Sequence, residues 1–195
     1  MATEQRPSTG QGATFDRFLE QMRGVWAAGR DESLPHRAKP VLEALLREAP
    51  ADEPWAAGIR RDAPIIRELY RDPEYGFLQL GHLMSPGPGP GTTPHDHGPC
   101  FVLYGVFEGE IELTTFRRTD DGSRPDRATL EEIETIRLKP GQVRAYLPGD
   151  IHLQRPTDPA GSVVLRFTSA DLDRVERHGF DQQTGEISRL PPIGN

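Results

Sequence analysis

Three histidines have the residue type and the spacing of a metal site. His95 and His97 flank Asp96, and His152 follows much later in the chain. Side chains alternate faces along an extended strand, so His95 and His97 should point the same way, roughly 6–7 Å apart. Two imidazoles at that separation can converge on one ion, and a third from a distant turn completes a facial set with open positions. We therefore predict that His95, His97 and His152 bind one metal ion.

The flanking segments separate this prediction from a chance His-x-His on a solvent-facing strand. The Pro- and Gly-rich run over 86–94 cannot be helical and favours a loop that leads into a strand. An apolar, β-rich run follows the pair, and Glu108-Gly109 is typical of a tight turn. Residues 140–152 repeat the order of strand, Pro-Gly turn and histidine. The pattern favours the two halves of a site in a small β-barrel.

These segments together resemble the cupin superfamily. The first cupin motif matches Gly91-x3-His95-x-His97 with a closing Gly109, and the second matches Gly141-x5-Leu147-Pro148-Gly149-x2-His152. Within the superfamily, Pro94-His95-Asp96-His97-Gly98 and Gly149-Asp150-Ile151-His152 are similar to the thiol dioxygenases, the cysteine and 3-mercaptopropionate dioxygenases. The resemblance covers roughly residues 60–172.

The chain departs from that family at five positions near the site. Many cupins carry a glutamate ligand where this chain has Phe101 and Val102. Val102 also holds the position of the cysteine that crosslinks to a tyrosine in animal cysteine dioxygenases, and Cys100 lies two residues too early for that role. Arg166 and Thr168 replace the histidine and the tyrosine of the family's Ser-His-x-Tyr relay. Iron binding is therefore better supported than the oxidation of cysteine itself.

The resemblance implies a mononuclear non-haem iron dioxygenase. Its expected cofactor is Fe(II), and its expected reaction oxidises a small, carboxylate-bearing thiol with O2 to a sulfinate. Nickel, zinc and cobalt also suit three imidazoles, so the resemblance alone favours iron. Two alternatives stay open. One is a cupin metalloenzyme of another type, an oxidative tailoring enzyme, lyase or isomerase on a small acid; the other is a non-catalytic ligand-binding cupin, against which the retained histidines argue.

Three residues are candidates for orienting the substrate. Arg166 should share a strand face with Val164 and Thr168, and a cation on an inward face needs an anionic partner. A substrate carboxylate or an acid at the barrel rim would serve. Arg144 and Tyr146 share one face of another strand, and the sequence leaves open whether that face or the opposite one points inward. We expect Arg166, Tyr146 and Arg144 to be the catalytic residues besides the metal ligands.

The predicted fold is α+β and mainly β, a single cupin (jelly-roll-like) barrel with N-terminal helices packed on one side. Apolar periodicity predicts helices over 14–28, 40–49 (with Pro40 in its first turn) and 63–71 (capped by Asp62). Strands are expected over 77–85, 101–107, 111–117, 133–138, 143–147 and 163–168. We divide the single domain into a flexible N-terminus (1–12), a helical part (13–75), the barrel (76–172) and a C-terminal surface extension (173–195).

Composition excludes several classes of protein. The 195 residues can bury one full core, and a net charge of −7 argues against nucleic acid as a partner. Apolar runs are too short to span a bilayer, the polar start lacks the apolar core of a secretory signal, and one cysteine allows no internal disulfide. We expect a cytoplasmic monomer or homodimer whose partners are a small thiol and O2. Cys100 should be a core residue, His82 a core or rim residue, and His36 and His178 solvated ones.

Overall fold

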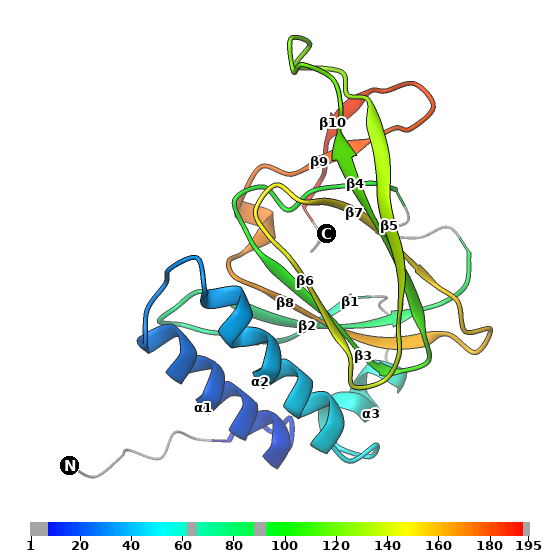
Figure 1. Cartoon of the computed structure of the whole chain (residues 1–195). Coiled ribbons are helices and arrows are strands. Elements are labelled where there is room, and N and C mark those ends of the chain that lie inside the picture. Colours follow the sequence, from blue (N-terminus) through cyan, green and yellow to red (C-terminus); the bar gives the residue numbers. More distant parts are fainter. Residues whose placement is uncertain (1–7, 62–65, 88–92, 193–195) are drawn as a thin grey trace.

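The computed structural model describes residues 8–61, 66–87 and 93–192, which form three α-helices packed against antiparallel strands (Figure 1). The elements in chain order are α1 (Ala13–Ala27), α2 (Leu34–Glu48), α3 (Pro54–Arg61), β1 (Ile66–Arg71), β2 (Leu78–Met84), β3 (Val102–Glu108), β4 (Ile111–Arg118), β5 (Leu130–Leu138), β6 (Val143–Tyr146), β7 (Ile151–Pro156), β8 (Ser162–Thr168), the 3-10 helix η1 (Leu172–Arg174), β9 (His178–Phe180) and β10 (Ile187–Arg189).

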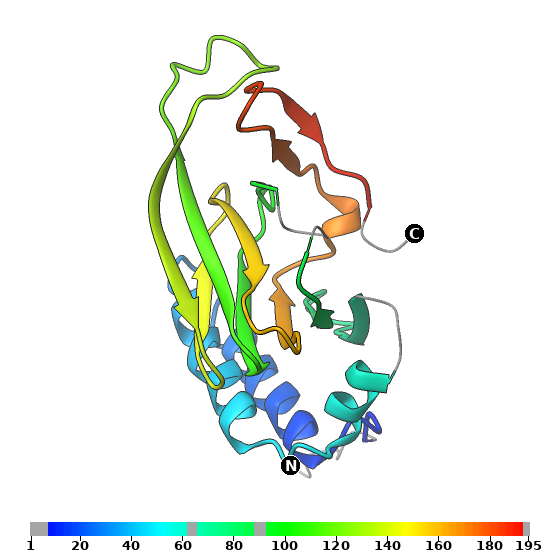
Figure 2. The ribbon, with the colours of Figure 1, turned by 90° about the vertical axis from the view of Figure 1, so that its right-hand side faces the viewer.

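Two sheets form the walls of the barrel. The larger has the strand order β1-β2-β8-β3-β6, the smaller the order β5-β4-β7, and every pairing is antiparallel. Figure 2 shows the sheets from the side, with the helices at one end and the β9–β10 hairpin at the other. The predicted fold class, a mainly β barrel with N-terminal helices on one side, is confirmed.

Alternation along β3 and β8 divides their buried side chains between two hydrophobic clusters. Inward residues of β3, β4 and β8 pack between the sheets, among them Tyr104, Leu113 and Val164. Outward residues of the large sheet instead pack on the helices, where the rings of Phe77 and Phe167 lie 5.0 and 5.3 Å from that of Trp26. Polar side chains on the inner faces are therefore held inside the barrel, away from the helices.

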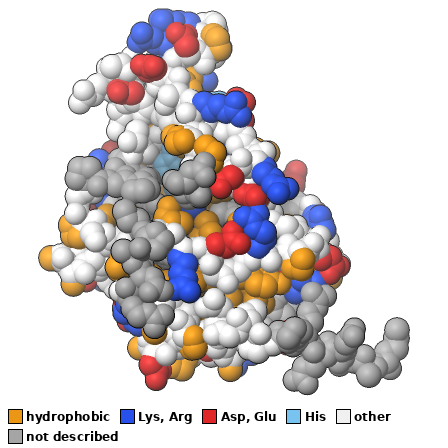
Figure 3. Space-filling view, turned by 180° about the vertical axis from the view of Figure 1, so that it is seen from behind, with side chains coloured by type: hydrophobic (Ala, Val, Ile, Leu, Met, Phe, Trp, Pro, Cys, Tyr) orange, Lys and Arg blue, Asp and Glu red, His pale blue; other side chains and the backbone are white. Residues whose placement is uncertain are grey.

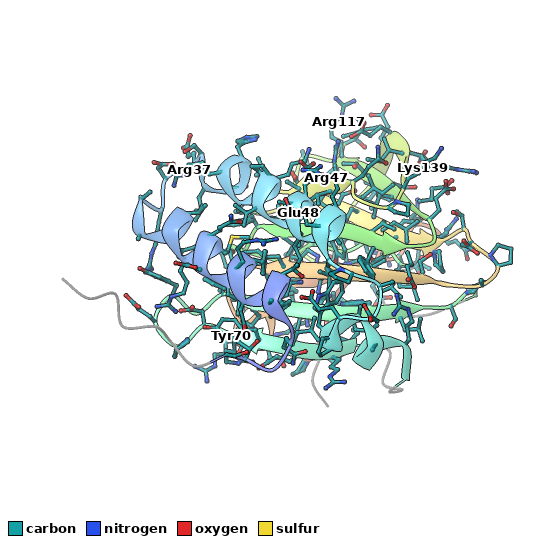
Figure 4. All side chains as sticks on the ribbon, turned by 90° about the horizontal axis from the view of Figure 1, so that it is seen from below. Arg37, Arg47, Glu48, Tyr70, Arg117 and Lys139 are labelled. Carbon is teal, nitrogen blue, oxygen red and sulfur yellow. The ribbon has the colours of Figure 1, made fainter. Side chains whose placement is uncertain are left out.

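Helices α1 and α2 cover the outer face of the large sheet. Phe15, Phe18, Leu19, Met22 and Trp26 form the buried stripe of α1, as the periodicity of 14–28 predicts. In Figure 4, Arg37 and Arg47 are labelled along α2, which lies beside α1 over the strands. None of the helices among the described residues is long and apolar enough to cross a membrane.

The second helix is longer than predicted. It begins at Leu34, so Pro35 stands in the first turn and Pro40 lies inside the helix, where the prediction was wrong. Proline removes one backbone donor from a helix interior and clashes with the preceding turn. Burial of Leu34 and Ala38 before Pro40 and of Leu42 after it continues one apolar stripe across the break. Tertiary packing thus outweighs the local penalty.

The helix predicted over 63–71 is wrong in its described part. Ile66–Arg71 is strand β1, which pairs with β2 through a register shift between Glu68 and Tyr70; residues 62–65, with the proposed Asp62 cap, lie outside the described residues. Non-local pairing along β2 overrides the short helical periodicity, as strand context commonly does. A short helix, α3, that the sequence did not predict precedes this segment.

The six predicted strands are all present, within three residues at each end. The sequence analysis missed β7, β9 and β10. Strand β7 contains His152, and the β9–β10 hairpin lies in the segment expected to be a surface extension.

Candidate metal centre

Two backbone hydrogen bonds hold the histidine motifs together. The His95 amide donates to the His152 carbonyl over 2.9 Å, and the His152 amide donates back to the His95 carbonyl over 3.0 Å. His97 lies two residues further on. One ligand atom from each of the three rings falls within 4.8 Å of the others, and the residues are 6 %, 2 % and 0 % exposed in chain order. The structure thus brings together the predicted ligand set.

The nitrogen positions fit one divalent ion. Nε2 of His97 lies 3.1 Å from Nε2 of His152. Two imidazole nitrogens bound at about 2.1 Å and at right angles to one ion would lie about 3.0 Å apart. His95 Nδ1 lies 2.9 Å from the Thr93 carbonyl oxygen, to which it can donate, so its Nε2 is left as the ligand atom. Nδ1 of His97 and of His152 is buried with no hydrogen-bond partner in the part of the chain that the structure describes.

Burial keeps the three imidazoles neutral. Desolvation lowers the pKa of His95 to about 4, although its hydrogen bond to Thr93 opposes the shift. Burial also lowers the pKa of His97 and of His152 well below the usual value, and the charge of Arg166 adds to the shift in both. A neutral imidazole has a lone pair to give to a metal, so these groups are ready to bind one at neutral pH.

Arg166 lies on the inner face of β8 together with Val164 and Thr168, and is 4 % exposed. Its Nε and Nη2 have no hydrogen-bond partner among the described residues, and no described carboxylate forms an ion pair with it. A second buried guanidinium, Arg177, is satisfied differently: it donates to the Leu172 and Pro191 carbonyls. Burial lowers the pKa of Arg177, and the charge of Arg166 lowers it further. The centre therefore has an excess of positive charge.

The structure settles which face of β6 points inward. Tyr146 packs inside the barrel, and its ring centroid lies 3.8 Å from that of His152. Val143 and Ala145 pack on the helical side instead. Arg144 forms an ion pair with Glu134 and lies over the Tyr146 ring, 5.7 Å from its centroid. Arg144 is therefore occupied by an acid of this chain, unlike Arg166.

Tyr104 is a site residue that the sequence analysis missed. It lies opposite Arg166 in the β3–β8 register, is fully buried, and places its hydroxyl 3.2 Å from His97 Nε2. Burial raises the pKa of Tyr104, although the charge of Arg166 opposes the shift, so the phenol keeps its proton. The signal was available, because Tyr104 alternates with Val102 and Val106 on the strand after the histidine pair.

The C-terminal segment forms one wall of the centre. The Asp96 amide donates to the His178 carbonyl over 3.0 Å, and the Phe180 amide donates to the Pro94 carbonyl over 2.8 Å. The Asp96 carboxylate in turn accepts from the amides of Gly98 and His178 and lies 3.2 Å from His178 Nδ1. The expectation that His178 is simply solvated is wrong, because its ring is tied to the loop between two candidate ligands.

The remaining expectations about individual residues concern the core and the surface. Cys100 is buried, and burial raises the pKa of its thiol, so it is not an activated nucleophile. His82 is a core residue on β2, as predicted, and burial lowers its pKa well below the usual value. His36 is exposed on α2. Asp150 accepts a hydrogen bond from the Leu147 amide and so closes the turn before His152.

Comparisons with known proteins give structural neighbours only. No family model matches the chain, and no curated protein matches it. An oxalate oxidase in complex with glycolate aligns with 49 % of this chain at 17 % identity and a TM-score of 0.38, and this chain covers 42 % of it, less than half its length. KdgF from Halomonas sp. aligns with 58 % of this chain and 88 % of its own at 19 % identity and a TM-score of 0.41. The Cnp3 cupin domain of Schizosaccharomyces pombe aligns with 56 % of this chain and 67 % of its own at 13 % identity and a TM-score of 0.38. None of the three is a thiol dioxygenase, so that type remains a prediction.

Proposed function

We propose that this protein is a mononuclear non-haem iron enzyme that oxidises a small, carboxylate-bearing thiol with O2 to a sulfinate. The observation that carries the proposal is a cluster of three buried histidines inside the barrel, together with one buried arginine that has no acidic partner among the described residues. A cytoplasmic location and a monomeric or homodimeric state accompany it as predictions.

His95, His97 and His152 would hold the metal. Three neutral imidazoles leave open positions on an ion, which is what the binding of a substrate and O2 requires. A bound iron would supply the redox chemistry and would favour the thiolate form of the substrate. The choice of iron rests on the motifs around His95 and His152, because the ligand set alone suits nickel, zinc and cobalt as well.

Arg166 would bind the carboxylate of the substrate. A buried cation without an acidic partner is unfavourable, and none of the described carboxylates pairs with Arg166. An incoming carboxylate would supply both the opposite charge and acceptors for Nε and Nη2. Arginine offers two parallel N–H donors, which fix the orientation of a carboxylate as well as its position. A small acid bound in this way is held beside the histidines.

Tyr104 would orient the reacting end of the substrate. Its protonated hydroxyl lies beside His97 Nε2, the nitrogen that faces the metal position, and is therefore placed to donate a hydrogen bond to a group bound there. Tyr146 packs against the other side of His152 and holds that ring in place. Both rings fill the barrel around the centre and exclude bulk water from it.

The proposed reaction balances without an external reductant. One thiol and one O2 give one sulfinic acid: two S–O bonds form, the O–O bond breaks, and sulfur supplies the four electrons. The thiol proton leaves when the thiolate forms. No second cofactor is needed, in keeping with a centre of one metal and a few side chains.

A cupin enzyme of another reaction type remains the second candidate. The guanidinium of Arg166, which no described carboxylate pairs with, suits any small carboxylic acid, with or without a thiol. A lyase, isomerase or other oxidative enzyme acting on such an acid would use the same three histidines. The two candidates differ in whether a thiol is consumed together with O2.

Metal analysis followed by oxygen uptake separates these candidates. The metal-free protein is loaded with Fe(II) under nitrogen, and oxygen is then added with 3-mercaptopropionate, cysteine, cysteamine or the thiol-free propionate. We expect one iron per chain, and oxygen consumption that matches sulfinate formation with the thiol acids. Stoichiometric iron with no thiol-dependent oxygen uptake would refute the thiol proposal and favour the second candidate. An Arg166→Met protein with unchanged kinetics would show that the guanidinium does not bind the substrate.

A further inference from the structure

We propose that a pocket beside Arg166 binds an apolar tail of the substrate, so that the preferred substrate is a thiol acid with a short alkyl branch. The inference rests on the proposed function and makes its substrate class more specific. The pocket lies between β1, β2, β8 and the segment around Leu172, and its volume is about 110 Å³.

The pocket shares a face of the large sheet with Arg166. Leu80 pairs with Arg166 across β2 and β8, and Leu78 pairs with Thr168, one step further along the same face. Leu78, Leu80 and Thr168 all line the pocket. Residues directly opposite in an antiparallel pair have side chains on the same side of the sheet, so the wall of the pocket adjoins the guanidinium.

Arg166 also connects the pocket to the histidines. On its other side, Arg166 pairs in register with Tyr104, whose hydroxyl contacts His97. The order along the inner face is therefore pocket, guanidinium, phenol and histidine cluster. The charge of Arg166 acts on the pKa of all three histidines, which agrees with this placement. A thiol acid with its sulfur at the metal position and its carboxylate on Arg166 would direct a branch toward the pocket.

The lining of the pocket suits an alkyl group. Ile66, Leu78, Leu80 and Leu172 provide apolar walls, and the three leucines are at most 7 % exposed. A volume of about 110 Å³ corresponds to roughly three or four groups the size of a water molecule, at ~30 Å³ each. The pocket would thus take a branch of three or four carbons.

Charged side chains also line the pocket: Glu68, Arg71, Asp171 and Asp173. Arg71 binds Glu68 on its own strand at 2.7 Å and Asp171 on the segment after β8. Figure 3 shows side chains of both charges gathered beside hydrophobic ones on the face seen from behind. Acidic Glu68 and Asp171 would repel a second carboxylate at the end of the branch, so a monocarboxylic acid fits and a dicarboxylic acid does not.

A series of 3-mercaptoalkanoates tests the inference. Their branch on the thiol-bearing carbon is lengthened one carbon at a time, and binding to the Co(II)-loaded protein is followed by the thiolate charge-transfer band in the near ultraviolet. We expect the dissociation constant to fall up to about fourfold for each methylene, the factor that full burial of one gives, until three or four carbons are present. It should then level off or rise.

Two variants of one pocket residue should change the dependence of the dissociation constant on branch length in opposite directions. Leu78→Phe fills the pocket and should abolish the fall of the dissociation constant with branch length. Leu78→Ala enlarges the pocket and should move the optimum to a longer branch, which keeps the test valid if the larger side chain prevents folding. Leu83→Phe, on the opposite face of β2, is the matched control and should leave this dependence as it is.

The outcomes separate this inference from the proposed function. Two results would overturn the pocket assignment and leave the thiol function standing, provided that every thiol acid gives a charge-transfer band. One is a dissociation constant that does not depend on branch length, and the other is an equal dependence on branch length in both Leu78 variants. Calorimetry with thiol-free carboxylic acids of the same branch lengths supplies the other arm. If the affinity for these thiol-free acids depends on branch length, and Leu78→Phe abolishes that dependence, the pocket assignment is supported. If no thiol gives a charge-transfer band in the same protein, the proposal of a thiol substrate is refuted.

Discussion

Val102 lies directly opposite Thr168 in the register of β3 against β8, and both side chains are fully buried on the inner face of the barrel. In the thiol dioxygenases that the sequence resembles, the position of Thr168 carries the relay tyrosine, and in the animal cysteine dioxygenases the position of Val102 carries the crosslinking cysteine. The fold brings these positions together, but a valine and a threonine cannot form such a crosslink. The next pair on the same face is Tyr104 and Arg166, so a phenol and a guanidinium remain beside the histidines.

Replacing His152 with alanine should remove the metal. One of three ligands is lost, while the backbone bonds between His95 and residue 152 do not depend on the side chain. We expect metal content to fall from one ion per chain to a small fraction, with a near-native circular dichroism spectrum. Elemental analysis of dialysed protein measures this, with His36→Ala, at an exposed histidine, as the control. Full metal occupancy in the His152→Ala protein would contradict the ligand assignment.

Replacing Arg166 with methionine should weaken substrate binding without weakening the fold. A charge-assisted hydrogen bond contributes about 1.5–3 kcal/mol, which is lost from the binding free energy of a carboxylate substrate. Removing a buried charge that has no acidic partner among the described residues should leave the free energy of unfolding unchanged or raised. Steady-state kinetics and urea unfolding measure the two effects, and Arg117→Met, at an exposed arginine, is the control. Lower stability together with an unchanged KM would show that Arg166 is a structural residue.

Replacing Tyr104 with phenylalanine should change the chemistry more than the metal content. The ring still fills its place in the core, and only the hydroxyl beside His97 is removed. We expect full metal loading, a shifted ligand-field spectrum of the Co(II) protein with bound thiol, and a fall in kcat of about tenfold, as for a lost hydrogen bond of ~1.4 kcal/mol. Tyr75→Phe, at a half-buried tyrosine stacked on Arg23, serves as the control. An unaltered spectrum and kcat would exclude contact between the hydroxyl and the bound substrate.

Replacing Asp96 with alanine should loosen the centre from its C-terminal wall. The carboxylate holds Gly98 and the His178 segment through hydrogen bonds of 2.9–3.2 Å. Loss of such supporting contacts typically lowers metal affinity about 10–100-fold. Competition with a chelator gives the affinity, and Asp31→Ala, at an exposed carboxylate, is the comparison. Equal chelator competition in both variants would show that the wall does not position the ligands.

The strands and the histidine cluster could be predicted from the sequence because their signals are local. Apolar alternation marks β3, β4 and β8, and the position of His152 after a Pro-Gly turn marks the second half of the site. The inward face of β6 could not be predicted, because Arg144 and Tyr146 are as compatible with a solvated face as Val143 and Ala145 are with a buried one. Packing of the helices on Val143 decides it.

Long-range pairing explains what the sequence analysis missed. Strand β1 has helical periodicity and becomes a strand only because β2 lies beside it. The role of His178 depends on a backbone bond to Asp96, far away in sequence, which no local pattern records. Tyr104 is the exception, since the alternation of β3 already places it on the face of the site.

Acid should destabilise the metal-free protein well above the range in which its carboxylates titrate. His82, His95, His97 and His152 all have a lowered pKa in the folded state, mainly because they are buried. The unfolded chain takes up their protons near pH 6.5 and the folded chain does not, so stability is full above that pH and falls below it. Each histidine contributes up to about 1.4 kcal/mol per pH unit between pH 6.5 and its folded pKa, which is about 4 for His95.

Urea unfolding at pH 7, 6 and 5 in the presence of a chelator measures this slope. The carboxylates with a lowered pKa, such as Asp171, contribute little above pH 5, because their unfolded value is 3.8. Of these four histidines, His82 lies outside the metal centre, and His82→Leu removes its titration. The free energy of unfolding of the His82→Leu protein should therefore fall less steeply with acid than that of the wild type. Equal slopes in the two proteins, or stability that rises between pH 7 and 5, would show that these histidines take up protons in the folded state.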